Sequence, residues 1–512
     1  MPPVPDAPDD RPATARTAQR IVILGGGTAG WMAAAALARL LGPAGWAITL
    51  VESATIATVG VGEATIPPIR TFHAMLGIDE QDFLRATGGS WKLGIRFEGW
   101  SGPGSSYVHA FGQPGTDVAG LPFHAQWLRA RMADRAERLE RYSLEARAAE
   151  AGRFSPPRDN GDSPLSRIGY AYHFDAVRYA AFLRRFAEAH GATRREGTVI
   201  DVEHGPAGIA ALRMTDGQRI AGDLFLDCSG FASRLLGQAL DTSWVDWSAW
   251  LPCDRAVAVG STADAAPLPL TRSIAHAAGW RWRIPLRHRT GNGRVFASHF
   301  LSEDEATAGL LASLDSDAIG EPRVLRFATG HRRQFWVGNC IGLGLASGFL
   351  EPLESTSIHL VQSGVQHVLR LLPPTGAGMS TADVARARYN RTMTAEFEGV
   401  RDFLIAHYHL NSRDEPFWRE RAMMPPPPGL AEKLALFRGG GRLFREPDEL
   451  FNAWSWLALF TGQGVRAEGH DPVCDGWPVD RVAERLARIE AVIAASLEHM
   501  PPHADALARL DG

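Results

Sequence analysis

The sequence predicts an α/β protein, and two observations near its N-terminus support this prediction. A short apolar run at residues 20–25 leads into a glycine-rich turn, and the alanine-rich segment at residues 31–41 has the composition of a helix. A second apolar run follows at residues 46–51. Strand, turn, helix and strand together form a βαβ unit of about 30 residues, which is the usual beginning of a parallel sheet.

Length and charge narrow the class of protein. A chain of 512 residues with 45% hydrophobic content can bury a large core, so we expect an enzyme of two closely packed modules rather than a short binding module. A net charge of -4 offers no broad positive surface, and we expect no nucleic-acid partner. The longest apolar run is shorter than the roughly 20 residues that a membrane span needs, so we expect no membrane insertion.

The N-terminal segment and the cysteines indicate the compartment. Residues 1–19 contain prolines and aspartates but no apolar core, which predicts a short disordered tail and no secretory signal. The 4 cysteines are far apart and form no CxxC pair, so neither a metal site nor a disulfide framework is expected. A cytoplasmic protein fits this pattern best, and both a monomer and a homodimer remain open.

Composition along the chain suggests the domain organisation. We expect residues 20–375 to form one nucleotide-binding domain, with a helical excursion at about 113–165 that includes a solvated surface helix over residues 125–153. Alternating apolar residues and a Thr-Asp-Gly turn within residues 200–232 predict an inserted β-meander. After a proline pair the chain is mostly helical, so residues 376–512 are assigned to a helical module.

The glycine-rich turn predicts the nucleotide site. It has the G-x-G-x-x-G spacing between a strand and a helix, where glycines allow close backbone approach and the helix N-terminus attracts a pyrophosphate. An acidic residue at the end of the second strand can accept hydrogen bonds from a ribose, although a surface glutamate after an ordinary turn is the alternative. The expected contacts are Gly25, Gly27, Thr28, Ala29, Gly30 and Glu52.

Later segments favour FAD over NAD. Asp227-Cys228-Ser229-Gly230 closes a predicted strand, as the second nucleotide-proximal segment does in many two-dinucleotide-fold flavoproteins, and Asp227 is added to the expected contacts. A further strand at residues 335–337 ends at Gly338-Asn339. The sequence has no second complete fingerprint for NAD(P)H. We therefore expect a monooxygenase-like FAD-binding fold with two dinucleotide-binding domains, and a separate reductase that supplies the reduced flavin.

Two motifs with unusual residues suggest chemistry. In Trp280-Arg281-Trp282-Arg283-Ile284-Pro285 the two indoles lie on one face of an extended strand, where they can fill a core or wall a pocket. Lys92 and Lys433 are the only lysines among 53 basic residues. A buried ammonium can donate a hydrogen bond, and burial lowers its pKa toward a neutral amine, which arginine does not provide. A lysine reaching solvent is the alternative.

The segment at residues 348–358 combines an anion site with a carboxylate. Its Ser355-Thr356-Ser357 run predicts a helix start whose unpaired N–H groups can bind an anion, although a plain helix cap would use the same residues. Glu354 comes directly before this run and can act as a general base.

Together these motifs resemble the flavin-dependent tryptophan halogenase family over about residues 20–510. The W-x-W-x-I-P run, the lysine segment, the E-S-T-S segment and Val61-Gly62-Glu63-Ala64-Thr65-Ile66-Pro67-Pro68 are all similar to family segments. The resemblance implies a halogenase that uses FADH2 diffusing from an NAD(P)H flavin reductase. With O2 and chloride or bromide it would make hypohalous acid and halogenate a small electron-rich aromatic, such as an indole or tryptophan.

The resemblance also implies residue roles. Lys92 and Glu354 would be catalytic, with Lys92 either a hydrogen-bond donor to hypohalous acid or a haloamine. Thr356 and Ser357 would bind halide, but the family often has glycine at position 357, which leaves the halide preference open. The remaining assignments are flavin contacts at Gly62, Glu63, Ala64 and Gly348, a flavin–substrate partition at Trp280 and Trp282, and substrate contacts at His109, Phe111, Trp454 and Trp456.

The helical module would cover the substrate. Residues that would hold the ammonium and carboxylate of a free amino acid are not evident, so a bare indole, a peptide or another aromatic ring remains open. Two other functions are also compatible with the sequence: a flavin monooxygenase that hydroxylates an aromatic, and a non-catalytic flavin-binding sensor of an aromatic ligand. The mass of the product distinguishes hydroxylation from halogenation, and oxygen-dependent turnover distinguishes either enzyme from the sensor.

Overall fold

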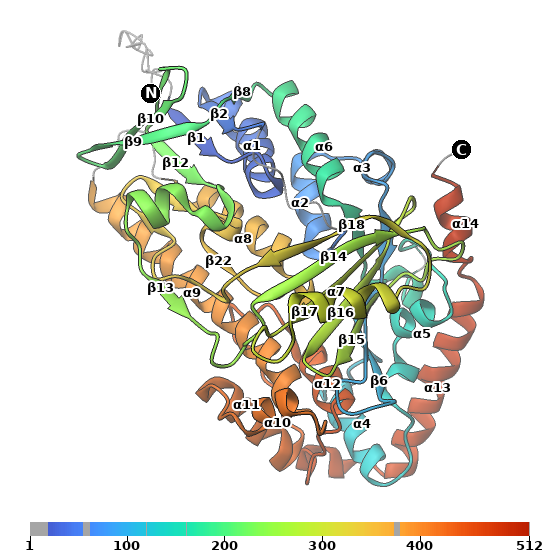
Figure 1. The fold of residues 1–512 in the computed structure, drawn as a ribbon. Helices are drawn as coiled ribbons and strands as arrows, with labels where there is room; N and C mark the ends of the chain where they lie inside the picture. The colour runs from blue at the N-terminus through green and yellow to red at the C-terminus, as the bar shows by residue number, and fades with distance from the viewer. Residues whose placement is uncertain (1–18, 55–61, 119, 160, 373–378, 511–512) are drawn as a thin grey trace, which may run out of the picture.

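The computed structural model of the chain describes residues 19–54, 62–118, 120–159, 161–372 and 379–510. Apart from Gln19, the predicted disordered tail at residues 1–19 lies outside the described residues, as does Val61. One large sheet lies at the upper left of Figure 1 and the other to the right of its centre, while C-terminal helices lie at the bottom and along the right side.

A six-stranded sheet carries the glycine-rich turn. β1 (Arg20–Leu24) pairs in parallel with β2 (Ala47–Glu52) on one side and with β12 (Leu224–Asp227) on the other. α1 (Thr28–Leu41) connects β1 to β2, and its alanine run is buried, which confirms the predicted βαβ unit. The order is β20-β21-β12-β1-β2-β8, and the outer strands are β8 (Thr193–Glu196), β20 (Trp336–Val337) and β21 (Cys340–Gly342).

A seven-stranded sheet, which the sequence analysis did not predict, forms the other half of the core. Its neighbouring strands are antiparallel except for β15 and β5, which are parallel. The order is β18-β14-β17-β16-β15-β5-β6. The strands are β5 (Gly94–Glu98), β6 (Ser106–Ala110), β14 (Arg255–Ser261), β15 (Thr271–His276), β16 (Gly279–Pro285), β17 (Thr290–Phe296) and β18 (Ala318–Arg326).

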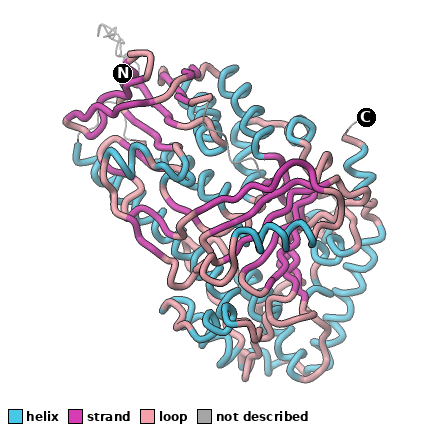
Figure 2. Tube along the Cα trace, viewed as in Figure 1, coloured by secondary structure: helices cyan, strands magenta, loops and turns pink. Residues whose placement is uncertain are grey.

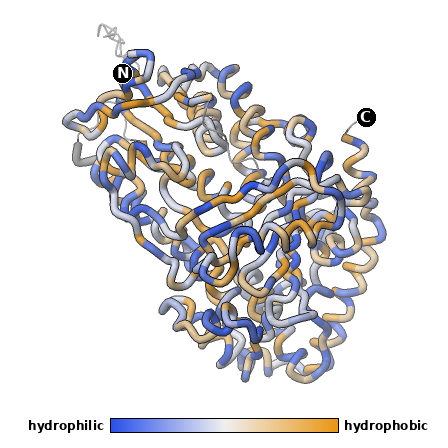
Figure 3. Tube along the Cα trace, viewed as in Figure 1, coloured by the Kyte–Doolittle hydropathy of each residue, from blue (hydrophilic) through white to orange (hydrophobic). Residues whose placement is uncertain are grey.

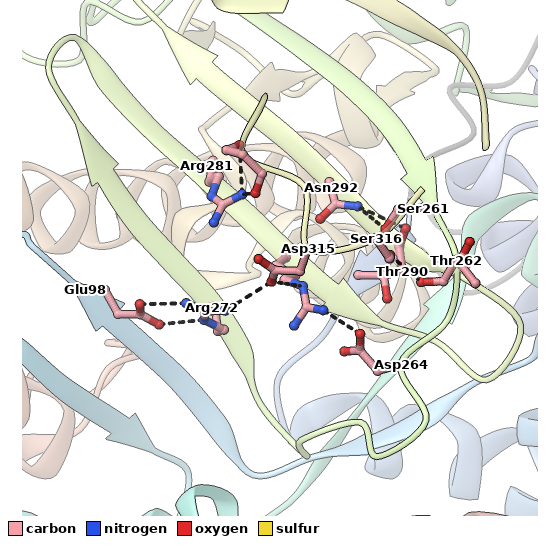
Figure 4. A network of polar contacts seen from close by, with 12 residues as sticks. Glu98, Ser261, Thr262, Asp264, Arg272, Arg281, Thr290, Asn292, Asp315 and Ser316 are labelled. Atoms are coloured by element: carbon pink, nitrogen blue, oxygen red, sulfur yellow. Dashed lines mark hydrogen bonds and ion pairs between the residues drawn. The ribbon is translucent and has the colours of Figure 1, made fainter. Parts of the chain in front are cut away.

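The two faces of β16 have opposite character because side chains alternate along a strand. Trp280 and Trp282 share the buried face, with ring centroids 6.0 Å apart. On the other face Asp315 joins two arginines, since its carboxylate lies 3.6 Å from an Arg272 nitrogen and 3.1 Å from an Arg283 nitrogen. Figure 4 shows this polar network across the strands. The tryptophans therefore face the core, whereas Arg272 and Arg283 on the opposite face of the sheet form ion pairs with Asp315.

Three small sheets complete the strands. In the segment where a β-meander was expected, β9, β10 and β11 form an antiparallel sheet, and the chain then returns through β12 to the six-stranded sheet. The second small sheet, β3-β7-β4, contains the lysine segment, and the third is β13-β19-β22. These strands are β3 (Gly62–Ala64), β4 (Ser90–Lys92), β7 (Ala171–Asp175), β9 (Val199–Gly205), β10 (Gly208–Met214), β11 (Arg219–Ala221), β13 (Trp244–Asp246), β19 (Gly330–Arg332) and β22 (Gly348–Phe349).

The C-terminal part is helical, as predicted. Between residues 379 and 510 the described chain contains helices and loops only, which Figure 2 shows by colour. The helices there are α9 (Met379–His409), α10 (Pro416–Met423), α11 (Pro428–Gly440), α12 (Ala453–Gly462), α13 (Val479–Glu498) and α14 (His503–Ala508). No helix among the described residues has the length and apolar character required to span a membrane.

The prediction of one solvated surface helix over residues 125–153 is wrong. The segment contains most of α4 (Phe123–Met132), a 3-10 turn and α5 (Leu144–Glu150), and most of both helices is buried. Both helices pack against α13, which comes more than 300 positions later in the sequence. The apolar and alanine positions of this segment therefore face a partner helix that local sequence does not reveal.

The α/β class with a helical C-terminal part is thus confirmed. Hydrophilic and hydrophobic residues alternate along strands of the seven-stranded sheet, and many outer helical turns are hydrophilic (Figure 3). The remaining helices are α2 (Pro68–Leu76), α3 (Glu80–Thr87), α6 (Ala176–Ala189), α7 (Glu303–Ala312) and α8 (Ser357–Leu371).

Candidate active site

A cavity of about 800 Å³ extends from the glycine-rich turn to the loop before α8. This volume lies within the range of roughly 300–1,000 Å³ typical of cofactor and ligand sites. Of the predicted site residues, those lining it are Gly25, Gly27, Thr28, Ala29, Glu52, Gly62, Glu63, Ala64, Trp282, Gly348 and Ser357. The described part of the chain contains no group of three or more His, Cys, Asp or Glu side chains that could hold a metal ion.

The glycine turn is shaped for close backbone approach. Gly25 has φ 118°, and a Cβ there would lie 2.1 Å from the carbonyl oxygen of Cys228. A Cβ on Gly30 would lie 1.8 Å from the oxygen of Gly25, so Gly30 packs the turn against the helix and does not line the cavity. Gly27 caps α1 without a side chain, so the first N–H groups of the helix, beginning at Thr28, face a site suited to phosphate.

Glu52 stands at the end of β2 and lines the same cavity. Its carboxylate accepts a hydrogen bond from Nε1 of Trp31 at 3.3 Å and forms an ion pair with Arg194. These neighbours orient the carboxylate beside the turn. Cavity size, an open helix N-terminus and a carboxylate at the second strand all fit a dinucleotide such as FAD.

Asp227, which was expected to contact the cofactor, does not line the cavity. Asp227 is fully buried, and its carboxylate accepts hydrogen bonds from the N–H groups of Ser229, Leu235 and Leu236 at 3.0, 2.8 and 2.8 Å. It therefore caps the turn that follows β12. The next residues, Cys228 and Ser229, line the cavity instead.

Lys92 is fully buried at the end of β4, which excludes a solvent-exposed lysine. Its Nζ donates to the carbonyl oxygen of Thr65 at 3.0 Å and to Oγ of Ser355 at 2.8 Å. The Phe111 ring centroid lies 5.1 Å from Nζ. Burial lowers the pKa of Lys92 to about 7, although the negative charge of Glu354 raises it in part. The amine thus titrates near neutral pH.

Ser355 connects Lys92 to the cavity, because it contacts the amine and also lines the cavity. It has φ 59°, a left-handed conformation that costs a residue other than glycine about 1–2 kcal/mol. Directly after it, Thr356 is the N-cap residue of α8, and its buried Oγ1 has no hydrogen-bond partner among the described residues. The predicted helix start is confirmed, and Ser357 is its first residue.

Glu354 is a buried carboxylate held between two histidines. Its Oε2 lies 2.8 Å from Nδ1 of His109, and its Oε1 lies 2.8 Å from Nε2 of His407. Burial alone would raise the pKa of Glu354, but the charge of His109 and the hydrogen bonds from His109 and His407 outweigh it and lower this pKa to about 2. The carboxylate is therefore ionised at neutral pH. Its charge also acts on Lys92, so the two predicted catalytic groups lie in one site.

His407 and Tyr107 belong to this site, and the sequence analysis missed both. Because a carboxylate only accepts hydrogen bonds, Nε2 of His407 donates to Glu354, and Nδ1 then accepts from the Tyr107 hydroxyl at 2.9 Å. Tyr107 lies two positions before His109 on β6, hence on the same face, a spacing that could have indicated it. A histidine within the long helix α9 carries no comparable signal.

The two partition tryptophans differ in their surroundings. Trp282 lines the cavity, whereas Trp280 does not line it and is fully buried. The Trp280 indole donates from Nε1 to Oε2 of Glu351 at 2.8 Å. Glu351 lies three positions before Glu354 in the same loop. The two buried glutamates stand at the two ends of the 3-10 turn Pro352–Glu354, Glu351 as its N-cap residue and Glu354 as its last residue.

The two tryptophans of α12, Trp454 and Trp456, do not line the cavity. Trp456 is buried, its Nε1 donates to Glu449 at 2.5 Å, and its ring packs against Phe403. Trp454 lines a small pocket with Val108 and Ala110, which point to the face of β6 opposite His109. Trp456 therefore packs against α9, whereas Trp454 lies between α12 and β6.

Comparisons with known proteins agree with this geometry. The family model described as tryptophan halogenase matches residues 20–478. A tryptophan 6-halogenase from Streptomyces albogriseolus is 36% identical, with 96% of this chain and 98% of the relative covered. A tryptophan 7-halogenase from Lentzea aerocolonigenes is 37% identical over 82% of each chain.

Solved structures are similar over nearly the whole chain. A flavin-dependent halogenase from Xanthomonas campestris is 46% identical with a TM-score of 0.92, and 97% of this chain and 99% of that chain are covered. One from Brevundimonas sp. BAL3 is 45% identical with a TM-score of 0.91, and the covered shares are 97% and 100%.

Proposed function

Since the chain belongs to the tryptophan halogenase family and is a flavin-dependent halogenase, we propose that Lys92 and Glu354 carry its halogen-transfer step. Its cofactor is FAD, used as FADH2 from a separate flavin reductase, and its halide is chloride or bromide. When bound, FADH2 together with O2 and halide supplies hypohalous acid. Gly25, Gly27 and Glu52 would hold the dinucleotide, as the shape of the turn suggests.

The observation that supports this proposal most strongly is the position of Ser355. Its hydroxyl contacts Lys92, the residue itself lines the cavity, and it directly follows Glu354 in the chain. Hypohalous acid made in the cavity would reach Lys92 and Glu354 past the Ser355 segment. Trp282 lines the cavity wall, and with Trp280 would keep the substrate from direct contact with the flavin.

Lys92 would act as a hydrogen-bond donor to the oxygen of hypohalous acid. An ammonium has three N–H donors, and two of them contact Thr65 and Ser355. A third donor polarises the oxygen–halogen bond, so the halogen becomes more electrophilic. As the carbon–halogen bond forms, the oxygen takes a proton from Lys92 and leaves as water.

Glu354 would stabilise the positive ring and take its proton. Its two histidine partners keep the carboxylate ionised, so its negative charge faces the cation that develops on the aromatic ring. The halogenated ring cation is a far stronger acid than a carboxylic acid, so even a base with a pKa of about 2 accepts the ring proton. Passing this proton to Lys92 restores both groups.

The halide site would lie at the start of α8. The buried Oγ1 of Thr356 has no partner within the described residues, and Ser357 lines the cavity. The N–H groups at the beginning of a helix attract anions. Chloride or bromide at this position would sit beside the flavin ring.

The substrate we propose is an indole-like aromatic bound near His109 and Phe111. Phe111 lies beside Lys92 and His109 contacts Glu354, so both border the catalytic pair. Relatives named tryptophan halogenases support an indole ring, whereas the structures from Xanthomonas campestris and Brevundimonas are named only as flavin-dependent halogenases. A free indole, a tryptophan and an indole within a larger molecule are all to be tested.

We also propose a cytoplasmic enzyme that receives FADH2 by diffusion. Its four cysteines are all described, and each is a buried free thiol, as in a reducing compartment. The low net charge of -4 is compatible with the absence of a nucleic-acid partner. A monomer and a homodimer remain alternatives that light scattering would distinguish.

Product mass tests the proposed function. The protein is incubated with FAD, a flavin reductase, NADH, bromide or chloride and a panel of indoles and phenols. We expect products in which one hydrogen is replaced by halogen. Products that gain oxygen without halogen would instead establish a monooxygenase, and oxygen-dependent flavin oxidation without any substrate product across the panel would contradict the assignment of these substrates.

A further inference from the structure

Glu351 is a fully buried carboxyl group outside the mechanism described above. Its Oε2 accepts two hydrogen bonds, from Nε1 of Trp280 at 2.8 Å and from the hydroxyl of Tyr408 at 2.6 Å. Its Oε1 is buried and has no hydrogen-bond partner within the described chain. This asymmetry disfavours an ionised carboxylate, because ionisation would place negative charge on a buried oxygen that no donor contacts.

The surroundings of Glu351 also disfavour a charge. The two titratable side chains that face it are Tyr408 from α9 and Cys253 from the segment before β14, with 3.8 Å between Sγ and the tyrosine hydroxyl. Burial raises the pKa of both groups, so both are neutral. The charged groups Asp254 and Arg421 act on Cys253. Burial also raises the pKa of Glu351 to about 7, although the hydrogen bonds from Tyr408 and Trp280 lower it in part.

Two consecutive residues of α9 support the two glutamates of the loop. His407 donates to Glu354, and the next residue, Tyr408, donates to Glu351. One glutamate is thus held by two histidines and the other by two neutral donors. Environments that give two neighbouring carboxyl groups different pKa values suit them to different roles. The same helix end therefore fixes both ends of the Glu351–Glu354 turn.

We infer that Glu351 is a positioning residue, a neutral carboxyl group that fixes the Trp280 indole and the turn bearing Glu354. The inference rests on the proposed function, in which Trp280 and Trp282 keep the substrate from direct contact with the flavin. Glu351 does not touch the reacting atoms. It acts through Trp280 and through the backbone that presents Glu354.

The protonation state is tested on the protein without cofactor or substrate. Infrared difference spectra of wild type against Glu351→Gln at pH 6 should show the carbonyl stretch of a protonated carboxyl group in wild type only. The band should shift in Tyr408→Phe, which removes one donor. Glu498→Gln, which changes an exposed glutamate of α13, is the control and should leave the band in place. A spectrum without this band would overturn the inference.

Unfolding provides a second measurement in case the infrared band overlaps others. The unfolded Glu351 ionises above its ordinary value of 4.5, while the folded group stays protonated until about pH 7. Wild type therefore loses stability between these values relative to Glu351→Gln. The urea midpoint of wild type should fall relative to that of Glu351→Gln from pH 5 to pH 7, and it should stay constant relative to that of Glu498→Gln. A constant difference would show that Glu351 is ionised.

The positioning role is tested by coupling, which is the halogenated product formed per FADH2 oxidised. Glu351→Gln keeps an oxygen acceptor for both donors and should retain wild-type coupling with a flat dependence on pH through 7. Glu351→Leu removes the acceptor and should lower coupling several-fold while flavin oxidation continues. If the leucine variant does not fold, Tyr408→Phe takes its place in the test. This variant removes one of the two donors to Glu351 and should show a smaller loss of coupling. Equal coupling in all variants would overturn the role.

The two proposals fail in different ways. If wild type halogenated no aromatic, the proposed function would fail, yet the infrared and unfolding measurements would still decide whether Glu351 is neutral. If wild type halogenates but the leucine and phenylalanine variants couple normally, only the positioning role is lost.

Discussion

Glu354 and His407 are 53 positions apart in the sequence, yet Oε1 of the glutamate lies 2.8 Å from Nε2 of the histidine. The contact joins the loop before α8 to the C-terminal end of α9, and both side chains are buried. Together with His109 it keeps Glu354 ionised. The acid–base state of the site therefore depends on a helix that contributes no residue to the sequence motifs.

Replacing His407 with phenylalanine should change the acid limb of the pH–rate profile. The ring can still stack on Phe97, whose centroid lies 4.4 Å away, but the donor to Glu354 is lost. The pKa of Glu354 should then rise from about 2, so activity is lost at a higher pH than in wild type. An unpaired buried oxygen should also cost about 1–3 kcal/mol of stability. His407→Gln keeps an N–H donor and is the control; identical acid limbs in all three proteins would contradict this role.

Lys92→Met should lower halogenation by about 10²- to 10⁴-fold, the usual contribution of a positioned proton donor. The nonpolar side chain fits the buried space but cannot donate to hypohalous acid. Oxidation of FADH2 should continue, because Lys92 does not line the cavity. Lys433→Met, at the only other lysine, is the control. Product mass spectrometry and flavin absorbance measure the two steps separately, and undiminished bromination of an indole would remove Lys92 from the mechanism.

The pKa of Lys92 predicts how stability depends on pH. Burial lowers it from 10.5 to about 7, so between these values the unfolded chain binds one proton more than the folded protein. The free energy of unfolding of wild type should therefore rise relative to Lys92→Met as the pH increases from 7 to 10. The gain should reach a few kcal/mol, since one pKa unit corresponds to about 1.4 kcal/mol. Urea unfolding at several pH values measures it; parallel curves would mean that the amine titrates normally.

The pH dependence of the halogenation rate distinguishes the two chemical roles of Lys92. If Lys92 donates a hydrogen bond as an ammonium, the halogenation step should slow as the pH rises through 7. A haloamine needs the neutral amine, so its rate would increase over the same range. Single-turnover measurements with added hypobromous acid isolate this step from flavin oxidation.

Two glycines of the turn offer a matched pair of alanine substitutions. At Gly25 a Cβ would lie 2.1 Å from a backbone oxygen and φ is 118°, so Gly25→Ala should destabilise the protein even without cofactor. At Gly27 no atom lies within 4 Å, so Gly27→Ala should fold normally. Its methyl group would stand where a pyrophosphate approaches the helix, and FAD affinity should fall. Thermal unfolding and quenching of flavin fluorescence measure the two effects; normal FAD affinity in Gly27→Ala would contradict the phosphate position.

Local patterns predicted the strand, turn and helix at one end of the cavity. The strand, glycine turn and helix at residues 20–41 lie together in sequence, so their spacing alone defines their geometry. The β-meander and the start of α8 were predictable for the same reason. The prediction for residues 125–153 failed because an alanine-rich helix has the same composition whether it faces solvent or another helix.

By itself the sequence determined the α/β class, the dinucleotide turn, and which lysine and glutamate to regard as catalytic, because each of these is encoded within a short segment. Only the tertiary structure decided that Ser355 connects Lys92 to the cavity, that His407 and His109 hold Glu354, and that Trp456 packs against Phe403 while Trp454 lies beside β6. These contacts join segments up to hundreds of residues apart. They depend on how sheets and helices pack, since burial and hydrogen-bond partners are properties of the folded chain and not of any one segment.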